Sequence, residues 1–128
     1  MKYLLDTHAF LWFINDDSLL SARARSIVEI PESTIYLSVA SIWEMAVKIS
    51  LGKLNTPLPL AEFVDEQLWR NSISLLEIRT AHAGQIATLP FHHRDLFDRL
   101  IIAQSLIEEL PIIGRDSIFD EYGVRRRW

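Results

Sequence analysis

The sequence predicts an α/β fold with three layers (α/β/α), in which helices cover both faces of a central, mainly parallel sheet. Short apolar runs alternate along the chain with longer segments whose apolar residues recur at helical spacing. Strands and helices that alternate in this way are joined by right-handed crossovers, which place the strands parallel to one another. The 128 residues contain no repeat or linker-like stretch, so we expect residues 1–128 to form a single domain.

The expected elements follow from these patterns. Strands are expected at residues 3–5, 35–38, 74–77 and 111–114, with a last short strand around Val124. Helices are expected at residues 8–14, 21–30, 42–49, 60–71, 80–89 and 97–109. Ser21 is suited to cap the second helix, Gly52 to end the third and Pro90 to end the fifth.

The composition excludes several kinds of chemistry. The chain has no cysteine, which rules out disulfides, zinc–thiolate sites and thiol catalysis. Its formal net charge of −4 argues mildly against a protein that coats nucleic acid, but does not exclude an enzyme that meets phosphate through bound cations. The first residues lack the pattern of a signal peptide, and no apolar run approaches the ~20 residues that span a bilayer. We therefore expect a cytoplasmic protein that does not associate with membranes.

Acidic side chains fall close to the ends of the predicted strands. Asp6 and Asp116 come directly after strands, and Glu44 lies on the helix that follows the second strand. Asp98 lies in the first turn of a later helix, with Asp95 three residues before it. Because ligands of parallel sheets bind beyond the carboxyl ends of the strands, we expect these acids to meet at one edge.

Carboxylates gathered at one place repel one another and raise each other's proton affinity. A hard divalent cation relieves this repulsion, and Mg²⁺ and Mn²⁺ prefer carboxylate and water oxygens. Such an ion supports phosphodiester hydrolysis without a protein nucleophile. Each acid also has an ordinary interpretation: Asp6 and Asp116 as helix caps, Glu44 as a solvated side chain, and Asp98 as a partner of Arg94 or Arg99.

Other polar and aromatic side chains have two interpretations each. His92 and His93 flank the acids, where they either ligate a metal and carry protons or simply lie on the surface. His8 is a candidate supporting group for Asp6, whereas His82 is expected to be structural. Arg99, Arg115 and the final arginines are candidates for contacts with phosphate. Three tryptophans are expected in the core: Trp12, Trp43 and Trp69.

Four segments together resemble the motifs of PIN-domain ribonucleases of the VapC toxin group. The first three are LDTHAFLW at 5–12, SVASIWE at 38–44 and DLFDRLIIAQ at 95–104. The fourth is IIGRD at 112–116, followed by Phe119 and by YGV at 122–124. They occur in the family's order and extend over nearly the entire chain. The resemblance implies an α/β/α sandwich, endoribonuclease activity that depends on Mg²⁺ or Mn²⁺, a homodimer, and a cognate antitoxin as partner.

By motif position, the resemblance assigns the metal-binding and catalytic roles to four acids: Asp6, Glu44, Asp98 and Asp116. Asp95 is a secondary candidate, because its position is often acidic in this group. One departure concerns Gly114, where the motif commonly has Thr or Ser two residues before the last acid. The absence of that hydroxyl favours a role for Asp116 through water rather than directly on the metal.

Two other functions remain open. One is a catalytically inactive PIN-like protein that binds RNA or a partner with the same scaffold; the presence of all four acids speaks against it. The other is a phosphatase that forms an aspartyl phosphate. Such enzymes typically carry a second Asp two residues after the nucleophile, and here that position is His8.

Overall fold

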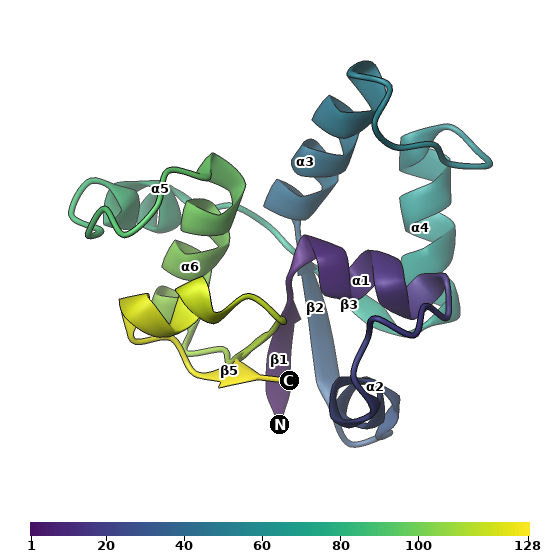
Figure 1. Ribbon diagram of the computed structural model, residues 1–128, viewed down its shortest axis with the longest axis horizontal. Coiled ribbons are helices and arrows are strands. Elements are labelled where there is room, and N and C mark those ends of the chain that lie inside the picture. Colours follow the sequence, from purple (N-terminus) through teal and green to yellow (C-terminus); the bar gives the residue numbers. More distant parts are fainter.

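The computed structural model describes residues 1–128 and contains one five-stranded sheet in which every neighbouring pair of strands is parallel (Figure 1). The order across the sheet is β3-β2-β1-β4-β5, so β1 lies at its centre. The strands are β1 (Lys2–Leu5), β2 (Thr34–Ser38), β3 (Ile73–Leu76), β4 (Ile112–Ile113) and β5 (Arg126–Arg127). The prediction of an α/β fold with a parallel sheet is confirmed.

Six α-helices and one 3₁₀ helix connect the strands. They are α1 (Thr7–Ile14), α2 (Ala22–Glu29), α3 (Val39–Ser50), α4 (Leu60–Arg70), α5 (Thr80–Ile86), α6 (Leu96–Glu108) and the 3₁₀ helix η1 (Ser117–Tyr122). Side-chain oxygens cap several of their N-termini, including Ser21 on α2 and Ser38 on α3. None of these helices combines the length and apolarity that crossing a membrane requires.

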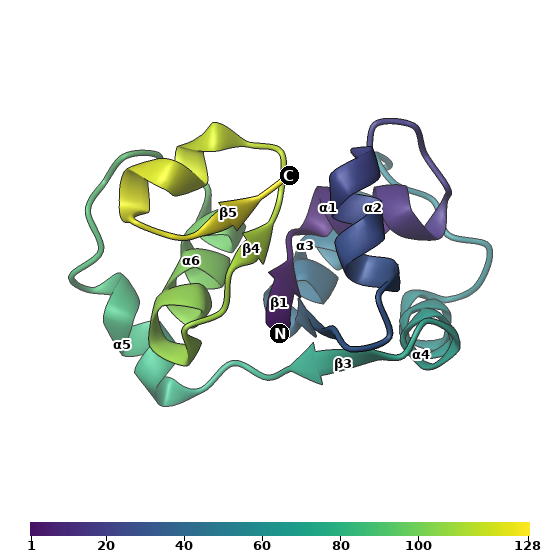
Figure 2. The ribbon, with the colours of Figure 1, turned by 90° about the horizontal axis from the view of Figure 1, so that it is seen from below.

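Two hydrophobic cores lie on opposite faces of the sheet, because successive strand residues point to opposite sides. Leu5, Leu37 and Ile113 belong to the first core, beneath α1–α4. Leu4 and Ile112 belong to the second, beneath α5, α6 and η1. Figures 1 and 2 show these two groups of helices on either side of the strands. The predicted three-layer arrangement is therefore present.

The strand register brings the loops of the site together. Leu5 is paired with Leu37 on one side and with Ile113 on the other. The first residue after β1 is therefore level with the end of β2 and with the residue after β4. The Asp6 amide donates to the Ile113 carbonyl at 3.0 Å, which extends this pairing one residue beyond β1.

Several expectations about local structure were wrong. The last strand lies at 126–127 rather than around Val124, which is instead buried in the second core, and η1 was not expected. Helix α5 ends at Ile86, and residues 87–89 continue as turns with i→i+3 bonds. Trp43 and Trp69 are 50% and 85% exposed, so neither is a core residue. Both are on helix faces that the sheet does not cover.

The interpretation of His82 as structural is confirmed. Its ring is fully buried, and Nδ1 accepts a hydrogen bond from the Arg79 amide at 2.9 Å. Nε2 therefore carries the proton and faces Glu108 at 2.6 Å, which ties the start of α5 to the end of α6.

Gln104 links three elements of the core. It is fully buried on α6, its Oε1 accepts from the Ser38 hydroxyl, and its Nε2 donates to the Glu77 carbonyl at 3.2 Å. Replacing Gln104 by Leu removes both bonds and should lower the free energy of unfolding by about 1–3 kcal/mol. Urea denaturation measures this loss. In a double-mutant cycle, Ser38→Ala combined with Gln104→Leu should cost less than the sum of the single changes; strictly additive costs would contradict the coupling.

Candidate active site

Asp6 stands at the centre of the carboxyl edge of the sheet. It follows β1 and caps α1, with Oδ1 accepting from the Ala9 amide at 2.7 Å. Only 5% of the residue is exposed, and no lysine, arginine or histidine forms an ion pair with it. Asp6 therefore caps the helix as predicted, and its carboxyl group is at the same time buried without a cationic partner.

Glu44 reaches the same edge from α3 and is 6% exposed. Its Oε1 accepts from the Thr7 hydroxyl at 2.7 Å, and its Oε2 lies 2.9 Å from Lys48 Nζ. Thr7 is also hydrogen-bonded to Ser41 at 2.9 Å, so α1 and α3 are joined beside the carboxylate. The interpretation of Glu44 as a solvated side chain was wrong. Lys48 was not singled out from the sequence, although its i,i+4 spacing from Glu44 is a recognisable signal.

Asp98 lies in the first turn of α6, and its backbone amide donates to Asp95, which caps the helix, at 2.9 Å. Asp98 Oδ2 lies 3.3 Å from His93 Nε2, and His93 Nδ1 lies 2.7 Å from the Tyr122 hydroxyl. The Tyr122 oxygen already accepts from the backbone amides of residues 92 and 93. Its own proton is therefore directed to His93 Nδ1, which leaves Nε2 to donate to Asp98 when the ring is neutral.

Arg99 has a structural role instead of the predicted contact with Asp98 or with phosphate. The residue is 2% exposed, and its guanidinium donates to the carbonyls of Pro90 at 2.8 Å and Leu89 at 3.2 Å. It also lies 4.2 Å from the centre of the Phe91 ring. Arg99 thus holds the segment that carries His93, and a buried cation in this position is unavailable to a ligand.

Asp116 is the most exposed of the four acids. It caps η1, with Oδ1 accepting from the Ile118 amide at 3.0 Å. Its negative charge still acts on Asp6, since it is one of the causes that raise the pKa of that group. The structure therefore places all four predicted site residues at one edge of the sheet, and their roles there remain a prediction.

Burial is the main cause that raises the pKa of two of these carboxyl groups. The pKa of Asp6 rises from 3.8 to about 7, with the charges of Asp98, Glu44 and Asp116 adding to the effect of burial. The pKa of Asp98 rises to about 6, through burial and the charge of Asp95, although the hydrogen bond from His93 opposes the shift. Removal from water is thus the common cause, and only Asp98 has a basic side chain, His93, that opposes it.

The donor set suits a hard cation by its chemistry, because every candidate ligand is a carboxylate oxygen and the buried Asp6 has no cationic partner. The side chains do not yet enclose such an ion: no three histidine, aspartate or glutamate side chains lie close enough together to coordinate one. Both Glu44 oxygens are engaged by Thr7 and Lys48. A cation that binds here has to draw Glu44 away from these partners.

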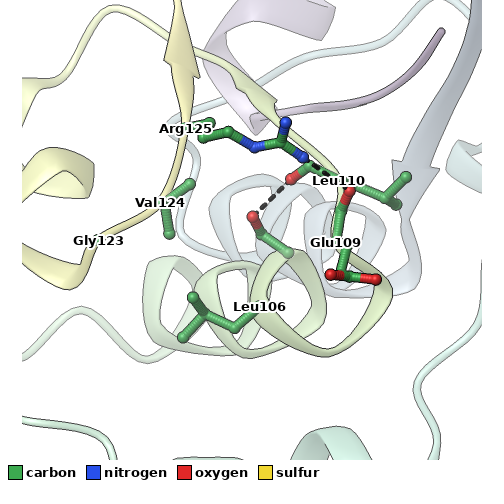
Figure 3. A pocket seen from close by; sticks show the side chains of 7 residues that line it. Leu106, Glu109, Leu110, Gly123, Val124 and Arg125 are labelled. Carbon is green, nitrogen blue, oxygen red and sulfur yellow. Dashed lines mark hydrogen bonds between the residues drawn. The ribbon is translucent and has the colours of Figure 1, made fainter.

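A hollow of about 420 Å³ opens beside the acids, lined by Asp6, His8, Trp12, Arg115, Asp116 and Ser117. A different hollow of about 310 Å³ lies between the end of α6 and the residues that precede β5 (Figure 3). There, Ser105 donates to the Leu110 carbonyl and Arg125 to the Glu109 carbonyl. This second hollow is at the amino ends of β4 and β5 and contains none of the four acids, so we assign the site to the first.

The fold and the buried acids define an α/β protein that gathers carboxylates at the carboxyl edge of a parallel sheet. The family model described as PIN domain matches residues 3–124, and the chain belongs to the PIN-domain family. The resemblance inferred from the four sequence motifs is thereby confirmed at the level of the family.

Individual relatives agree with this assignment. Ribonuclease VapC16 of Mycobacterium tuberculosis is 41% identical over 62 residues, which cover 48% of this chain and 44% of that protein. The match thus spans less than half of that relative's length. Among solved structures, VapBC2 from Rickettsia felis, bound to a promoter DNA fragment, has a TM-score of 0.73 at 15% identity and covers 100% of this chain and 99% of its own. VapBC-1 from nontypeable Haemophilus influenzae has a TM-score of 0.66 at 14% identity, with coverage of 99% and 97%. At these identities the solved structures show the fold.

The raised pKa of Asp6 predicts a pH dependence of stability. Between its ordinary value of 3.8 and about 7, the folded chain holds a proton that the unfolded chain has lost, so this group makes stability fall as pH rises. In the presence of a chelator, Asp6→Asn should therefore raise the free energy of unfolding at pH 8 by roughly 1–3 kcal/mol, with a smaller effect at pH 5. Asn retains the helix cap.

Urea denaturation at the two pH values measures this difference, with the exposed Asp65 of α4 changed to Asn as a control. An equal effect of Asp6→Asn at both pH values would show that the carboxyl group is not protonated in the folded chain.

Asp6 and Phe119 approach the backbone of Gly114 closely, which leaves no room there for the side chain of Thr or Ser. A methyl carbon on this residue would lie 2.7 Å from Asp6 Oδ2 and 3.1 Å from the Phe119 ring. Gly114→Ala should therefore lower the free energy of unfolding by about 1–3 kcal/mol. Gly84→Ala is the matched control: a methyl carbon there meets nothing within 4 Å, and alanine favours the helix. Thermal denaturation that shows no loss for Gly114→Ala would mean that Asp6 has room to move.

Proposed function

We propose that this protein is a metal-dependent endoribonuclease and the toxin of a type II toxin–antitoxin pair. The observation that carries the proposal is the buried Asp6, which lacks a cationic partner while three further carboxylates act on the same edge of the sheet or close to it. Folding places negative charge where it is costly, and a ligand of opposite charge is the simplest compensation. The relative named as a ribonuclease supports RNA as the substrate.

Asp6, Glu44 and Asp98 are the proposed ligands of Mg²⁺, for which Mn²⁺ is a possible substitute, and Asp116 assists directly or through water. When bound, the cation supplies charge that stabilises the transition state of phosphodiester hydrolysis and lowers the pKa of water. The chain itself fixes the geometry: the Ala9 amide holds Asp6, and the pair of His93 and Tyr122 orients Asp98. Burial excludes water from the back of the site, which strengthens electrostatic interactions there.

The proposed partners follow from the same family. The similar solved structures include VapBC complexes and a toxin–antitoxin complex from Klebsiella pneumoniae, which supports a cognate antitoxin for this chain. We also propose a homodimer and a cytoplasmic location, both expected from the resemblance and the composition. One domain over residues 1–128 is consistent with the extent of the family match.

A catalytically inactive protein that binds RNA or a partner is the second candidate. The ion pair between Glu44 and Lys48 favours it, because one of the four carboxylates is already neutralised. A protein that forms an aspartyl phosphate is less well supported, since His8 is exposed two residues after Asp6 and lines the hollow instead of supplying an acid. Of the nuclease and the inactive binding protein, only the nuclease requires a divalent cation and several intact acids together.

Cleavage of a mixed pool of RNA by the purified, antitoxin-free protein tests the proposal. Cleavage should require Mg²⁺ or Mn²⁺, and Asp6→Asn and Asp98→Asn should each reduce its rate by on the order of a hundredfold or more, because each removes charge that holds the cation. Asp65→Asn, an exposed acid on α4, should retain the full rate. Gel analysis of end-labelled RNA measures these rates.

The controls separate the two candidates. Circular dichroism and thermal denaturation establish that the variants are folded. Folded wild-type protein that binds the pool without cutting it would favour the inactive binding protein. Cleavage that persists in Asp98→Asn would contradict the assignment of that side chain.

A further inference from the structure

The hollow beside Asp6 and Asp116 has a wall that the acidic cluster does not explain. That wall consists of Trp12, His8 and Arg115, an aromatic ring flanked by basic side chains. The volume of about 420 Å³ lies within the range of ~300–1,000 Å³ found for small-molecule sites. The hollow is therefore large enough to hold the part of the substrate that lies next to the reacting phosphate.

Trp12 is half-buried and firmly held. One side of the side chain packs against the first hydrophobic core, and the Trp128 ring lies against it at a centroid distance of 5.8 Å. His8 is one helical turn earlier on α1, with its ring 5.6 Å away at an angle of 36°. A large aromatic side chain that is fixed by packing yet still borders a hollow is suited to stacking with a planar ligand.

Arg115 lines the hollow beside Trp12, and the contact of its guanidinium is a cation–π contact with the Trp12 ring. Its carbon Cζ is 6.0 Å from the centre of the Trp12 ring, and its side chain forms no ion pair or hydrogen bond. Two arginines near the end of the chain differ in this respect: Arg126 is paired with Asp120, and Arg125 donates to the Glu109 carbonyl. An exposed guanidinium whose N–H donors have no acceptor, at the edge of an acidic site, is suited to a phosphate.

We propose that Trp12 and Arg115 form a nucleotide subsite for single-stranded RNA, in which a base stacks on Trp12 while an adjacent phosphate binds Arg115. The inference rests on the proposed function and names what positions the strand beside the acids. Stacking on an aromatic face accepts any base, so the subsite orients the strand and does not read its sequence. Arg115 also offsets the repulsion between the phosphates and the carboxylates.

The test measures binding separately from cleavage. Asp98→Asn protein is titrated into two short fluorescent RNA strands of equal length, one a mixed-sequence pool and one abasic, and anisotropy gives each affinity. On this background, Trp12→Leu and Trp12→Phe test the stacking, and Arg115→Gln tests the phosphate contact. Trp69→Leu and Arg23→Gln are matched controls, since both residues are exposed on other helices, α4 and α2.

Trp12→Leu should weaken binding of the base-bearing strand by about fivefold or more and leave the abasic strand unaffected, because only the stacking is lost. Trp12→Phe should retain most of the affinity. Arg115→Gln should weaken both strands equally and reduce the slope of log affinity against log salt concentration by about one. The control variants should bind as the parent does.

Two negative results have different meanings. A folded protein that binds neither strand would overturn the proposed function and the subsite with it. RNA binding that is unchanged by Trp12→Leu and by Arg115→Gln would overturn the subsite alone. If Trp12→Leu fails to fold, the comparison of Arg115→Gln with Arg23→Gln and the behaviour of Trp12→Phe decide the question.

Discussion

The burial of the Asp6 carboxyl group is the constraint on which the site depends. The central strand β1 delivers this residue to the edge of the sheet, and its side chain also begins α1 by capping it. Gly114 leaves room for the carboxylate because it has no side chain. One residue thus links the central strand, the first helix and the end of β4, and its charge sets the electrostatics of the edge. Stability and function compete at this point, as is common where a chain is organised around a reaction.

The remaining acids reach the edge by different routes, and this decides how each is held. Glu44 comes from the middle of a helix and is neutralised within the chain by Lys48. Asp98 comes from a helix N-terminus and is supported by His93 and Tyr122, from segments on either side of α6. Asp116 remains exposed on a 3₁₀ turn. The site therefore combines carboxylates that are held in different ways: Asp6 by burial and a helix cap, Glu44 by an ion pair, and Asp98 by a histidine.

Much of the fold could be predicted from the sequence because strands and helices here have clean periodicities and clear caps. The four acids could be placed at one edge because the carboxyl ends of parallel strands coincide. Long-range contacts could not be predicted: nothing local indicates that Tyr122 would reach His93, or that Arg99 would be buried beneath Phe91. Trp43 and Trp69 were misplaced for a related reason, since hydrophobicity alone does not say which helix face the sheet covers.

The ion pair between Lys48 and Glu44 affects the balance of charge at the site. A tethered ammonium group supplies positive charge at one of the four carboxylates from within the same helix. The four carboxylates therefore repel one another less in the folded chain than four unpaired anions would. A divalent cation that bound Glu44, as proposed, would compete with Lys48, so its binding equilibrium would depend on how readily the lysine returns to solvent.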